Sequence, residues 1–368
     1  MRGFVGGLDL SGLFYEEAVR PILDSEFPGL THSAALIGYG SEVLGYDAPR
    51  STDHEWGPRL LLFVSEEEHR KYAARVAEVL RHGLPREFGG HSTHFGEPDE
   101  EGVRLPERGT SGPVDHKVEV HTVRGFFAWW TGLDPLGELG PTDWLRVPQQ
   151  RLLEVTAGRV YHDAFGELGK ARAKLAYYPR DVWLYMLAAQ WRRVGHLEAF
   201  VGRTGEAGDG LGSRLIAATL ARDLMGLCFL IERRYAPYAK WFGTAFSRLR
   251  CATELGPHLE GVLAADSWKE REAHLSRAYE TVARMHNELG VTPPLETGVT
   301  PFHGRPYLVL HAERFAAALE EAVTDQRVRS LPQGVGSADQ ITDSTDVLAR
   351  PEIYGRLGAL YGVPATGP

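Results

Sequence analysis

Apolar residues along the first 140 positions occur in short runs. Two of these runs, SAALIGYG at 33–40 and RLLLFV at 59–64, are typical of buried strands that end at glycine or polar residues. A third segment, VDHKVEVHTV at 114–123, alternates between apolar and polar residues, which predicts a strand with one buried face. Helical spacing is found at 14–27 and at 65–83. We therefore predict a mixed α/β domain in this part of the chain.

The alternation within 114–123 also assigns side chains to the two faces of the strand. Successive side chains of a strand point to opposite faces. Val118 and Val120 should therefore lie on the apolar face. Lys117, Glu119 and His121 should share the polar face, where they can contact residues of a neighbouring strand.

Beyond about Pro141 the pattern changes to helical periodicity. We predict a helical bundle, followed after a Pro-, Thr- and Gly-rich connector by two more helical stretches. The predicted helices cover 148–157, 166–176, 181–201, 211–234, 238–250, 267–289, 311–323 and 346–360. The predicted fold class is α+β. It comprises an α/β domain with a small mixed sheet (1–140), an all-α domain (141–290), and a connector with C-terminal helices that pack back on the core (291–368).

Composition narrows the function classes. The 368 residues carry a formal net charge of −9, which argues against a broad nucleic-acid-binding face. Two cysteines exclude a disulfide framework and a four-cysteine zinc site. No apolar stretch has the length of a membrane span, and the acid-interrupted N-terminus does not read as a signal peptide. We therefore expect a cytoplasmic protein without membrane contacts.

Two short segments carry the candidate chemistry. Asp53 and Glu55 are separated by one residue, so in an extended backbone both carboxylates point the same way. Two such carboxylates repel each other unless a cation lies nearby, which predicts a bound cation here. If the strand at 114–123 is a neighbour of the strand at 59–64, Glu119 joins them, and three carboxylates suit Mg²⁺. Gly40 and Ser41 follow an apolar strand at the predicted start of a short helix, where backbone N–H groups can bind phosphate.

Taken together, GYGS, TDHEW and VEV resemble the signature of the nucleotidyltransferase superfamily, whose core is similar to that of DNA polymerase beta. The signature covers about the first third of the chain. The helical half, above all ERRYAPYAKWFGTAF at 232–246, resembles a bacterial branch known only as a domain of unknown function.

The resemblance implies roles for individual residues. Gly40 and Ser41 would hold the triphosphate of a nucleoside triphosphate. Asp53 and Glu55 would bind two Mg²⁺ ions, one of them shared with Glu119. The family usually has aspartate at the position of Glu55, so the metal geometry and the rate depend on this longer side chain.

Other residues keep two interpretations. Lys240 could reach a phosphate from the helical domain, or its stem could lie along the neighbouring aromatic rings. His54, His116 and His121 could be ligands or a general base, although histidines are more often structural or solvent-facing. Asp181 could cap a helix or accept a proton from a hydroxyl.

The predicted function is Mg²⁺-dependent transfer of a nucleoside monophosphate from a nucleoside triphosphate to a hydroxyl of a small-molecule acceptor, with release of pyrophosphate. One alternative keeps this chemistry with a protein side chain or an RNA end as acceptor. The other is a nucleotide-binding sensor without efficient catalysis. Composition and spacing identify neither the acceptor nor the preferred nucleobase of the triphosphate.

Overall fold

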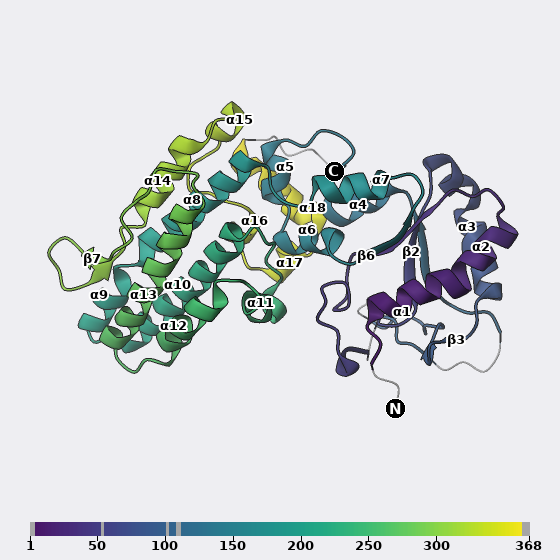
Figure 1. Cartoon of the computed structure of the whole chain (residues 1–368), viewed down its shortest axis with the longest axis horizontal. Coiled ribbons are helices and arrows are strands. Elements are labelled where there is room, and N and C mark those ends of the chain that lie inside the picture. Colours follow the sequence, from purple (N-terminus) through teal and green to yellow (C-terminus); the bar gives the residue numbers. More distant parts are fainter. Residues whose placement is uncertain (1–3, 53–54, 101–102, 108–111, 363–368) are drawn as a thin grey trace. The chain divides into compact units, whose positions relative to one another are not determined.

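The computed structural model describes residues 4–52, 55–100, 103–107 and 112–362. It has an α+β fold, as predicted, with a four-stranded sheet and a helical bundle (Figure 1). The chain forms two compact units. The first comprises Met1–Leu139 and Arg151–Ala176, and the second comprises Gly140–Gln150 and Tyr177–Pro368.

A four-stranded mixed sheet organises the first unit. Its strands are β1 (Ser33–Leu36), β2 (Arg59–Phe63), β5 (Lys117–His121) and β6 (Arg159–Asp163), in the order β5-β2-β1-β6. Strand β1 runs antiparallel to β2 and β6, and β2 runs parallel to β5. The three strands predicted from the sequence are all present, and β2 and β5 are neighbours.

Helices cover one face of this sheet. They are α1 (Gly7–Phe14), the π-helical turn η1 (Tyr15–Val19), α2 (Arg20–Glu26) and α3 (Glu66–Gly83). Their apolar side chains bury Leu60 and Leu62 of β2 and Val118 of β5, with Val120 packed alongside, as the alternation predicts. Helix α3 begins at the predicted residue because Ser65 and Glu68 form a reciprocal capping box.

The opposite face of the sheet carries the polar side chains of β2 and β5 and meets helix α4 (Val123–Thr131). The ring of Phe126 in α4 lies edge-on to that of Phe63 in β2, with centroids 5.5 Å apart. Only Thr122 separates β5 from α4, and its Oγ1 accepts a hydrogen bond of 3.0 Å from the backbone N–H of Gly125. The position of α4 is therefore coupled directly to that of β5.

Strand β6 was not predicted. It pairs with β1 at the edge of the sheet, with a shift in register between Ala34 and Ala35. Helix α6 (Gln149–Thr156) precedes it and α7 (Glu167–Lys174) follows it. Residues 151–176 therefore lie in the first unit, although the helical pattern assigned them to the bundle.

The segment between α3 and β5 forms a small hairpin. Strands β3 (Glu87–Phe88) and β4 (His91–Ser92) pair antiparallel. This agrees with the loop or hairpin expected from its glycine- and charge-rich composition.

Helices build the second unit, in which the long, mostly buried α8 packs against α10 and α14, and α12 packs against α13. The small hairpin of β7 (Thr300–Pro301) and β8 (Leu308–Val309) lies in the predicted connector. None of the helices in the described ranges is long and apolar enough to cross a membrane. The helices are α5 (Pro141–Arg146), α8 (Arg180–Leu197), α9 (Phe200–Glu206), α10 (Gly210–Ile231), α11 (Ala239–Phe246), α12 (Ala252–Ala264), α13 (Trp268–Glu288), α14 (Glu313–Ala322), α15 (Gln326–Arg329), α16 (Ala338–Ile341), α17 (Thr345–Leu348), α18 (Pro351–Tyr354) and the 3₁₀ segment η3 (Gly355–Tyr361).

Candidate functional site

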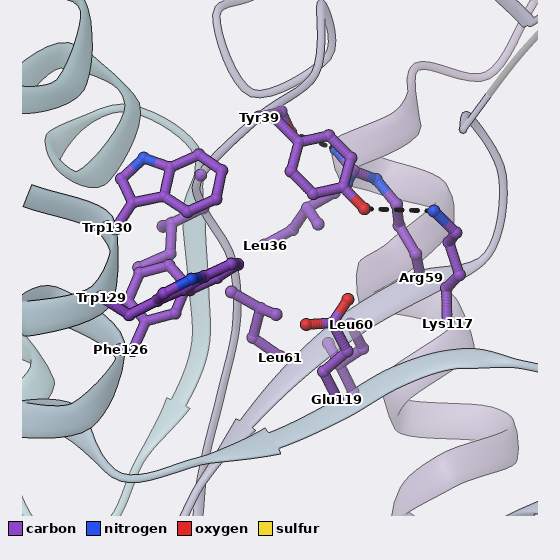
Figure 2. A pocket seen from close by; sticks show the side chains of 12 residues that line it. Leu36, Tyr39, Arg59, Leu60, Leu61, Lys117, Glu119, Phe126, Trp129 and Trp130 are labelled. Atoms are coloured by element: carbon purple, nitrogen blue, oxygen red, sulfur yellow. Dashed lines mark hydrogen bonds between the residues drawn. The ribbon is translucent and has the colours of Figure 1, made fainter. Parts of the chain in front are cut away.

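The candidate site is a pocket on the polar face of the sheet in the first unit. Arg59 and Leu61 of β2 lie opposite Lys117 and Glu119 of β5 in the parallel register. Figure 2 shows Arg59, Lys117 and Tyr39 on one side of the pocket and the rings of Phe126, Trp129 and Trp130 on the other. The pocket is lined by Leu36, Ile37, Gly38, Tyr39, Arg59, Leu60, Leu61, Lys117, Glu119, Phe126, Trp129 and Trp130.

A buried ion pair forms the floor of the polar side. The Arg59 side chain is 5 % exposed, and its Nε donates a hydrogen bond of 2.8 Å to Glu42 Oε1. Its Nη2 contacts the same carboxylate at 2.7 Å and also donates to the backbone carbonyl of Tyr39. Burial disfavours the charged guanidinium, but Glu42 outweighs this effect and holds the pKa of Arg59 above its ordinary value.

Gly40 is required by this ion pair. Its φ of +124° is in the region that favours glycine. A Cβ atom built there would lie 2.2 Å from Arg59 Nη2 and 2.5 Å from Glu42 Oε2. The glycine that we predicted to bind phosphate therefore allows the backbone to pass close to a buried guanidinium.

We expect Gly40→Ala to destabilise the first unit by about 2–4 kcal/mol. The added methyl group would strain the backbone at a positive φ and would also displace the buried ion pair. Gly45→Ala is the matched control, because Gly45 also has a positive φ (+71°) but has no atom within 4 Å of an added Cβ. It should cost only about 1–2 kcal/mol. Chemical unfolding of both variants measures the difference, and equal losses would contradict this role of Gly40.

A second ion pair joins the loop before β2 to β5. Lys117, which is 7 % exposed, pairs with Glu55 Oε1, which also accepts a 3.1 Å hydrogen bond from the backbone N–H of Arg104. Lys117 also donates to the Tyr39 hydroxyl at 3.2 Å. Burial opposes ionisation of Glu55, yet Lys117 and the Arg104 N–H together hold its pKa below the ordinary value. Burial likewise lowers the pKa of Lys117, against the attraction of Glu55.

Glu119 lies further along the same face of β5. Its Oε2 accepts a hydrogen bond of 3.1 Å from His121 Nε2. This bond is the main reason that the pKa of Glu119 lies below its ordinary value, since burial acts in the opposite direction. The His121 ring stacks on the indole of Trp129, with centroids 6.1 Å apart and planes at 13°.

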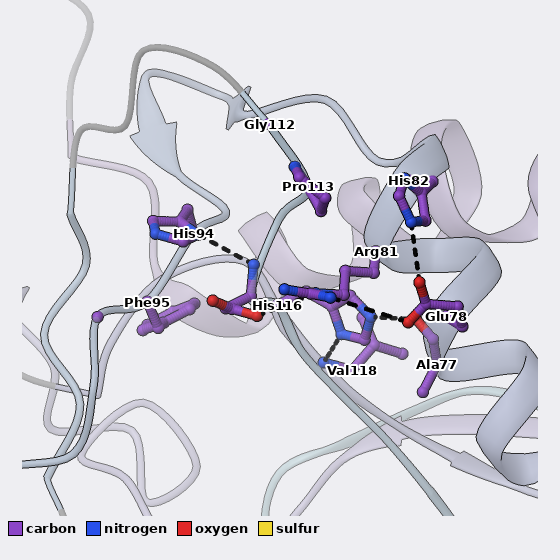
Figure 3. A network of polar contacts seen from close by, with 12 residues as sticks. Ala77, Glu78, Arg81, His82, His94, Phe95, Gly112, Pro113, His116 and Val118 are labelled. Carbon is purple, nitrogen blue, oxygen red and sulfur yellow. Dashed lines mark hydrogen bonds and ion pairs between the residues drawn. The ribbon is translucent and has the colours of Figure 1, made fainter.

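A network of polar contacts fixes the start of β5 (Figure 3). His94 Nδ1 accepts a hydrogen bond of 2.9 Å from the backbone N–H of Asp115, whose carboxylate pairs with Arg81 of α3 at 3.2 Å. His116 forms hydrogen bonds of 3.0 Å with the Ala77 carbonyl and 3.1 Å with the Val118 N–H. These histidines therefore position the backbone of the strand that presents Lys117 and Glu119.

The structure places the predicted site residues as follows. Gly40, Ser41, Glu55 and Glu119 all lie in the first unit, with Glu119 in the pocket wall and Glu55 joined to it through Lys117. Asp53 and His54 lie outside the described residues. Ser41 begins a turn, and the short helix predicted there is not formed.

Two predicted residues lie in the second unit. Lys240 is on α11, and its ammonium lies 5.2 Å from the centre of the Trp241 ring, the contact expected of a lysine that lies along aromatic side chains. Asp181 Oδ2 accepts hydrogen bonds from the Thr324 hydroxyl and from the backbone N–H groups of Thr324 and Asp325. It therefore anchors the segment that follows α14.

Sequence reasoning missed the two buried cations and the aromatic rings of the pocket. Glu42, Arg59 and Tyr39 carried no signal of their own, because nothing local indicates that a charged strand residue will be buried. Lys117 was assigned to the correct face, but without its partner. Trp129 and Trp130 belong to α4, which was not predicted as a helix.

Among the described residues, no three His, Cys, Asp or Glu side chains gather in a way that could hold a metal ion. The carboxylates of Glu55 and Glu119 supply only oxygen donors, which suits Mg²⁺. Glu119 is half-exposed and open to a ligand, whereas Glu55 is engaged by Lys117. This donor set fits a magnesium site only together with Asp53, two residues before Glu55.

Comparison with known proteins gives two matches. The model of a domain of unknown function, DUF4037, matches residues 144–242. A nucleotidyltransferase-like protein from Exiguobacterium sibiricum 255-15 is similar in structure at a TM-score of 0.34 and 11% sequence identity, over 84% of this chain and 89% of that chain. The chain has no match among curated proteins. The chain is thus an α+β protein with a charged pocket on its sheet, and its family match covers parts of both units, including strand β6.

Proposed function

We propose that the chain is a Mg²⁺-dependent nucleotidyltransferase that moves a nucleoside monophosphate to a hydroxyl of a small-molecule acceptor. The observation that carries the proposal is the gathering of distant segments at one pocket. Residues 38 and 39, Arg59, Lys117 and Glu119 line one pocket on the polar face of the sheet, and Glu55 is joined to Lys117 by an ion pair. Carboxylates for a metal and cations for phosphate are the groups that phosphoryl transfer requires.

The proposed roles follow from these positions. Asp53, Glu55 and Glu119 would hold two Mg²⁺ ions, which supply charge neutralisation at the phosphates and activation of the acceptor oxygen. Lys117 and Arg59 add positive potential on the same side of the pocket. The acceptor oxygen would bond to the α-phosphorus, the bond to the bridging oxygen would break, and pyrophosphate would leave as the hydroxyl proton is lost.

Metal binding would require Glu55 to exchange partners. Its carboxylate now contacts Lys117 and the backbone N–H of Arg104. If Glu55 helped to hold a divalent ion, the Lys117 ammonium would lose this partner and could contact a phosphate oxygen. This exchange offsets part of the cost of separating a half-buried ion pair.

Calorimetric titration tests the proposal. The wild-type protein is titrated with non-hydrolysable analogues of ATP, GTP, CTP and UTP, with and without Mg²⁺. We expect Mg²⁺-dependent binding that falls at least 100-fold in Asp53→Ala. The matched control is Glu16→Ala in the exposed ion pair with Arg20 of the same unit, which should leave binding unchanged. A folded protein that binds none of the four analogues would overturn the proposal.

The engagement of Glu55 by Lys117 favours a second candidate, a nucleotide-binding sensor without efficient catalysis. In this case nucleotide would bind with Mg²⁺, but the carboxylate would not be free to support turnover. A pyrophosphate-release assay with the four triphosphates and a panel of small hydroxyl acceptors separates the two functions. Binding without pyrophosphate release from any combination supports the sensor, whereas release that is lost in Asp53→Ala supports the enzyme.

A further inference from the structure

Trp129 is an exposed aromatic residue at the edge of the pocket. Its side chain is 59% exposed, although its neighbours Phe126 and Trp130 in α4 are buried. Its indole is backed by the His121 ring at 13°, and His121 is in turn hydrogen-bonded to Glu119. The Trp129 indole is therefore both exposed and supported from behind, so the flat ring of a ligand could stack on it.

The pocket has two chemically different sides (Figure 2). Arg59 and Lys117 lie on one side, and Trp129 and Trp130 lie on the other. The pocket between them is partly open, and its volume of about 10 Å³ has room for about one water molecule. A planar ring therefore does not fit inside, and a ligand that uses both sides would place its ring on the exposed indole.

We propose that Trp129 is the stacking platform for the nucleobase of the triphosphate. This inference rests on the proposed function and names the part of the chain that binds the base. A nucleoside triphosphate has a charged end and a flat aromatic end, which match the two sides of the pocket. Because only Thr122 connects β5 to α4, the indole is held at a fixed distance from Glu119 and Lys117.

The same geometry predicts weak discrimination between bases. Among the described lining residues, Arg59, Lys117 and the Tyr39 hydroxyl lie on the polar side, and Glu119 lies between the two sides. On the aromatic side, the Trp130 Nε1–H already donates a hydrogen bond of 2.9 Å to Glu154 Oε2. Stacking alone tolerates every base, because each base has an aromatic face. The four triphosphates should therefore bind within about tenfold of one another, with the larger purines bound more tightly.

The test compares whole nucleotides with inorganic tripolyphosphate, which has the charged end but no base. In the presence of Mg²⁺, Trp129→Leu should weaken binding of all four nucleotide analogues by about 10- to 100-fold. Its affinity for tripolyphosphate should equal that of the wild type. Trp129→Phe should retain most of the nucleotide affinity, and Phe200→Leu, at an exposed aromatic residue of the second unit, is the control for loss of a surface ring.

The outcomes separate this inference from the proposed function. Nucleotide binding that is lost in Asp53→Ala but unchanged in Trp129→Leu would overturn the role of Trp129 alone. Absence of binding to the wild-type protein would overturn both proposals. Equal weakening of nucleotide and tripolyphosphate in Trp129→Leu would assign Trp129 to the support of the pocket and contradict stacking. A preference for one base above about 100-fold would contradict the predicted tolerance.

Discussion

Replacing Glu42 with alanine is expected to lower the free energy of unfolding of the first unit by about 3–5 kcal/mol. The change leaves the Arg59 guanidinium, 5% exposed, without its counter-ion. Its Nε loses the 2.8 Å hydrogen bond to the Glu42 carboxylate, and the Tyr39 carbonyl is the acceptor that remains. Removing one partner of a buried pair is costly because the other charge stays buried. Urea unfolding followed by tryptophan fluorescence measures the loss.

Two further variants make this measurement specific. Glu16→Ala removes one carboxylate partner of Arg20 in an exposed pair of the same unit, where the Arg20 and Glu16 side chains are 45% and 51% exposed, and should cost less than about 1 kcal/mol. The double variant Glu42→Leu with Arg59→Leu removes both charges and should recover much of the loss. If Glu42→Ala cost no more than Glu16→Ala, the pair would not be buried in the folded protein.

The elements that sequence reasoning predicted correctly are those with a strong local signal. Strand β5 has strict alternation, so the division between its apolar valines and the polar side chains of Lys117, Glu119 and His121 was correct. Helix α3 has an N-cap box at Ser65 and basic residues in its last turn, so its ends were predicted within one residue. In both cases, residues adjacent in sequence contain the needed information.

The elements that sequence reasoning missed lack a clear local signal, and two of them contain residues that disfavour the structure they form. Helix α4 is rich in aromatic residues, which favour strands, and only contact with the sheet selects the helix. Helix α12 contains Pro257 and two glycines, which disfavour a helix. Gly261 allows close packing, since a Cβ there would lie 2.4 Å from the His274 ring of α13. Strand β6 is a short edge strand with partly exposed side chains.

Spacing and the family resemblance name Asp53, Glu55 and Glu119 as candidate ligands, and this assignment stays a prediction. The structure places Glu119 in the pocket wall and Glu55 in the ion pair with Lys117, while Asp53 lies outside the described residues. Their ionic partners depend on which loop residue reaches which strand residue, and that follows from register and from the path of the loop. The pairing of Glu42 with Arg59 and of Glu55 with Lys117 is therefore information that only the folded structure contains.

His286 is expected to make the stability of the second unit strongly pH-dependent. Its ring is fully buried, and burial lowers its pKa from 6.5 to about 4. Trp191 Nε1 can only donate, so its 3.2 Å hydrogen bond assigns a lone pair to His286 Nδ1 and the ring proton to Nε2, beside Thr292 Oγ1 at 3.1 Å. Protonation of Nδ1 would break the bond to Trp191 and bury a charge against the ring of Phe315.

The direction of the pH effect follows from the lowered pKa. Below pH 6.5 the unfolded chain takes up a proton at this histidine, whereas the folded protein does so only near pH 4. The contribution of neutral His286 to the free energy of unfolding is therefore complete above about pH 7 and is lost progressively as the pH falls to 4. The full loss is about 3 kcal/mol. Urea unfolding of the second unit at pH 7.5, 6, 5 and 4 measures it.

His286→Asn is the matched variant, because its amide oxygen can still accept the hydrogen bond from Trp191 and the side chain does not titrate. It should be less stable than the wild type at pH 7.5, since the smaller side chain leaves a gap against Phe315. Its stability should fall less steeply with decreasing pH, and the two curves should converge by about 3 kcal/mol between pH 7.5 and pH 4. All other titrating groups are the same in both proteins, so the difference between the curves isolates this residue. Parallel curves would show that His286 takes up its proton equally in the folded and unfolded chains, which a ring buried between Trp191 and Phe315 cannot do.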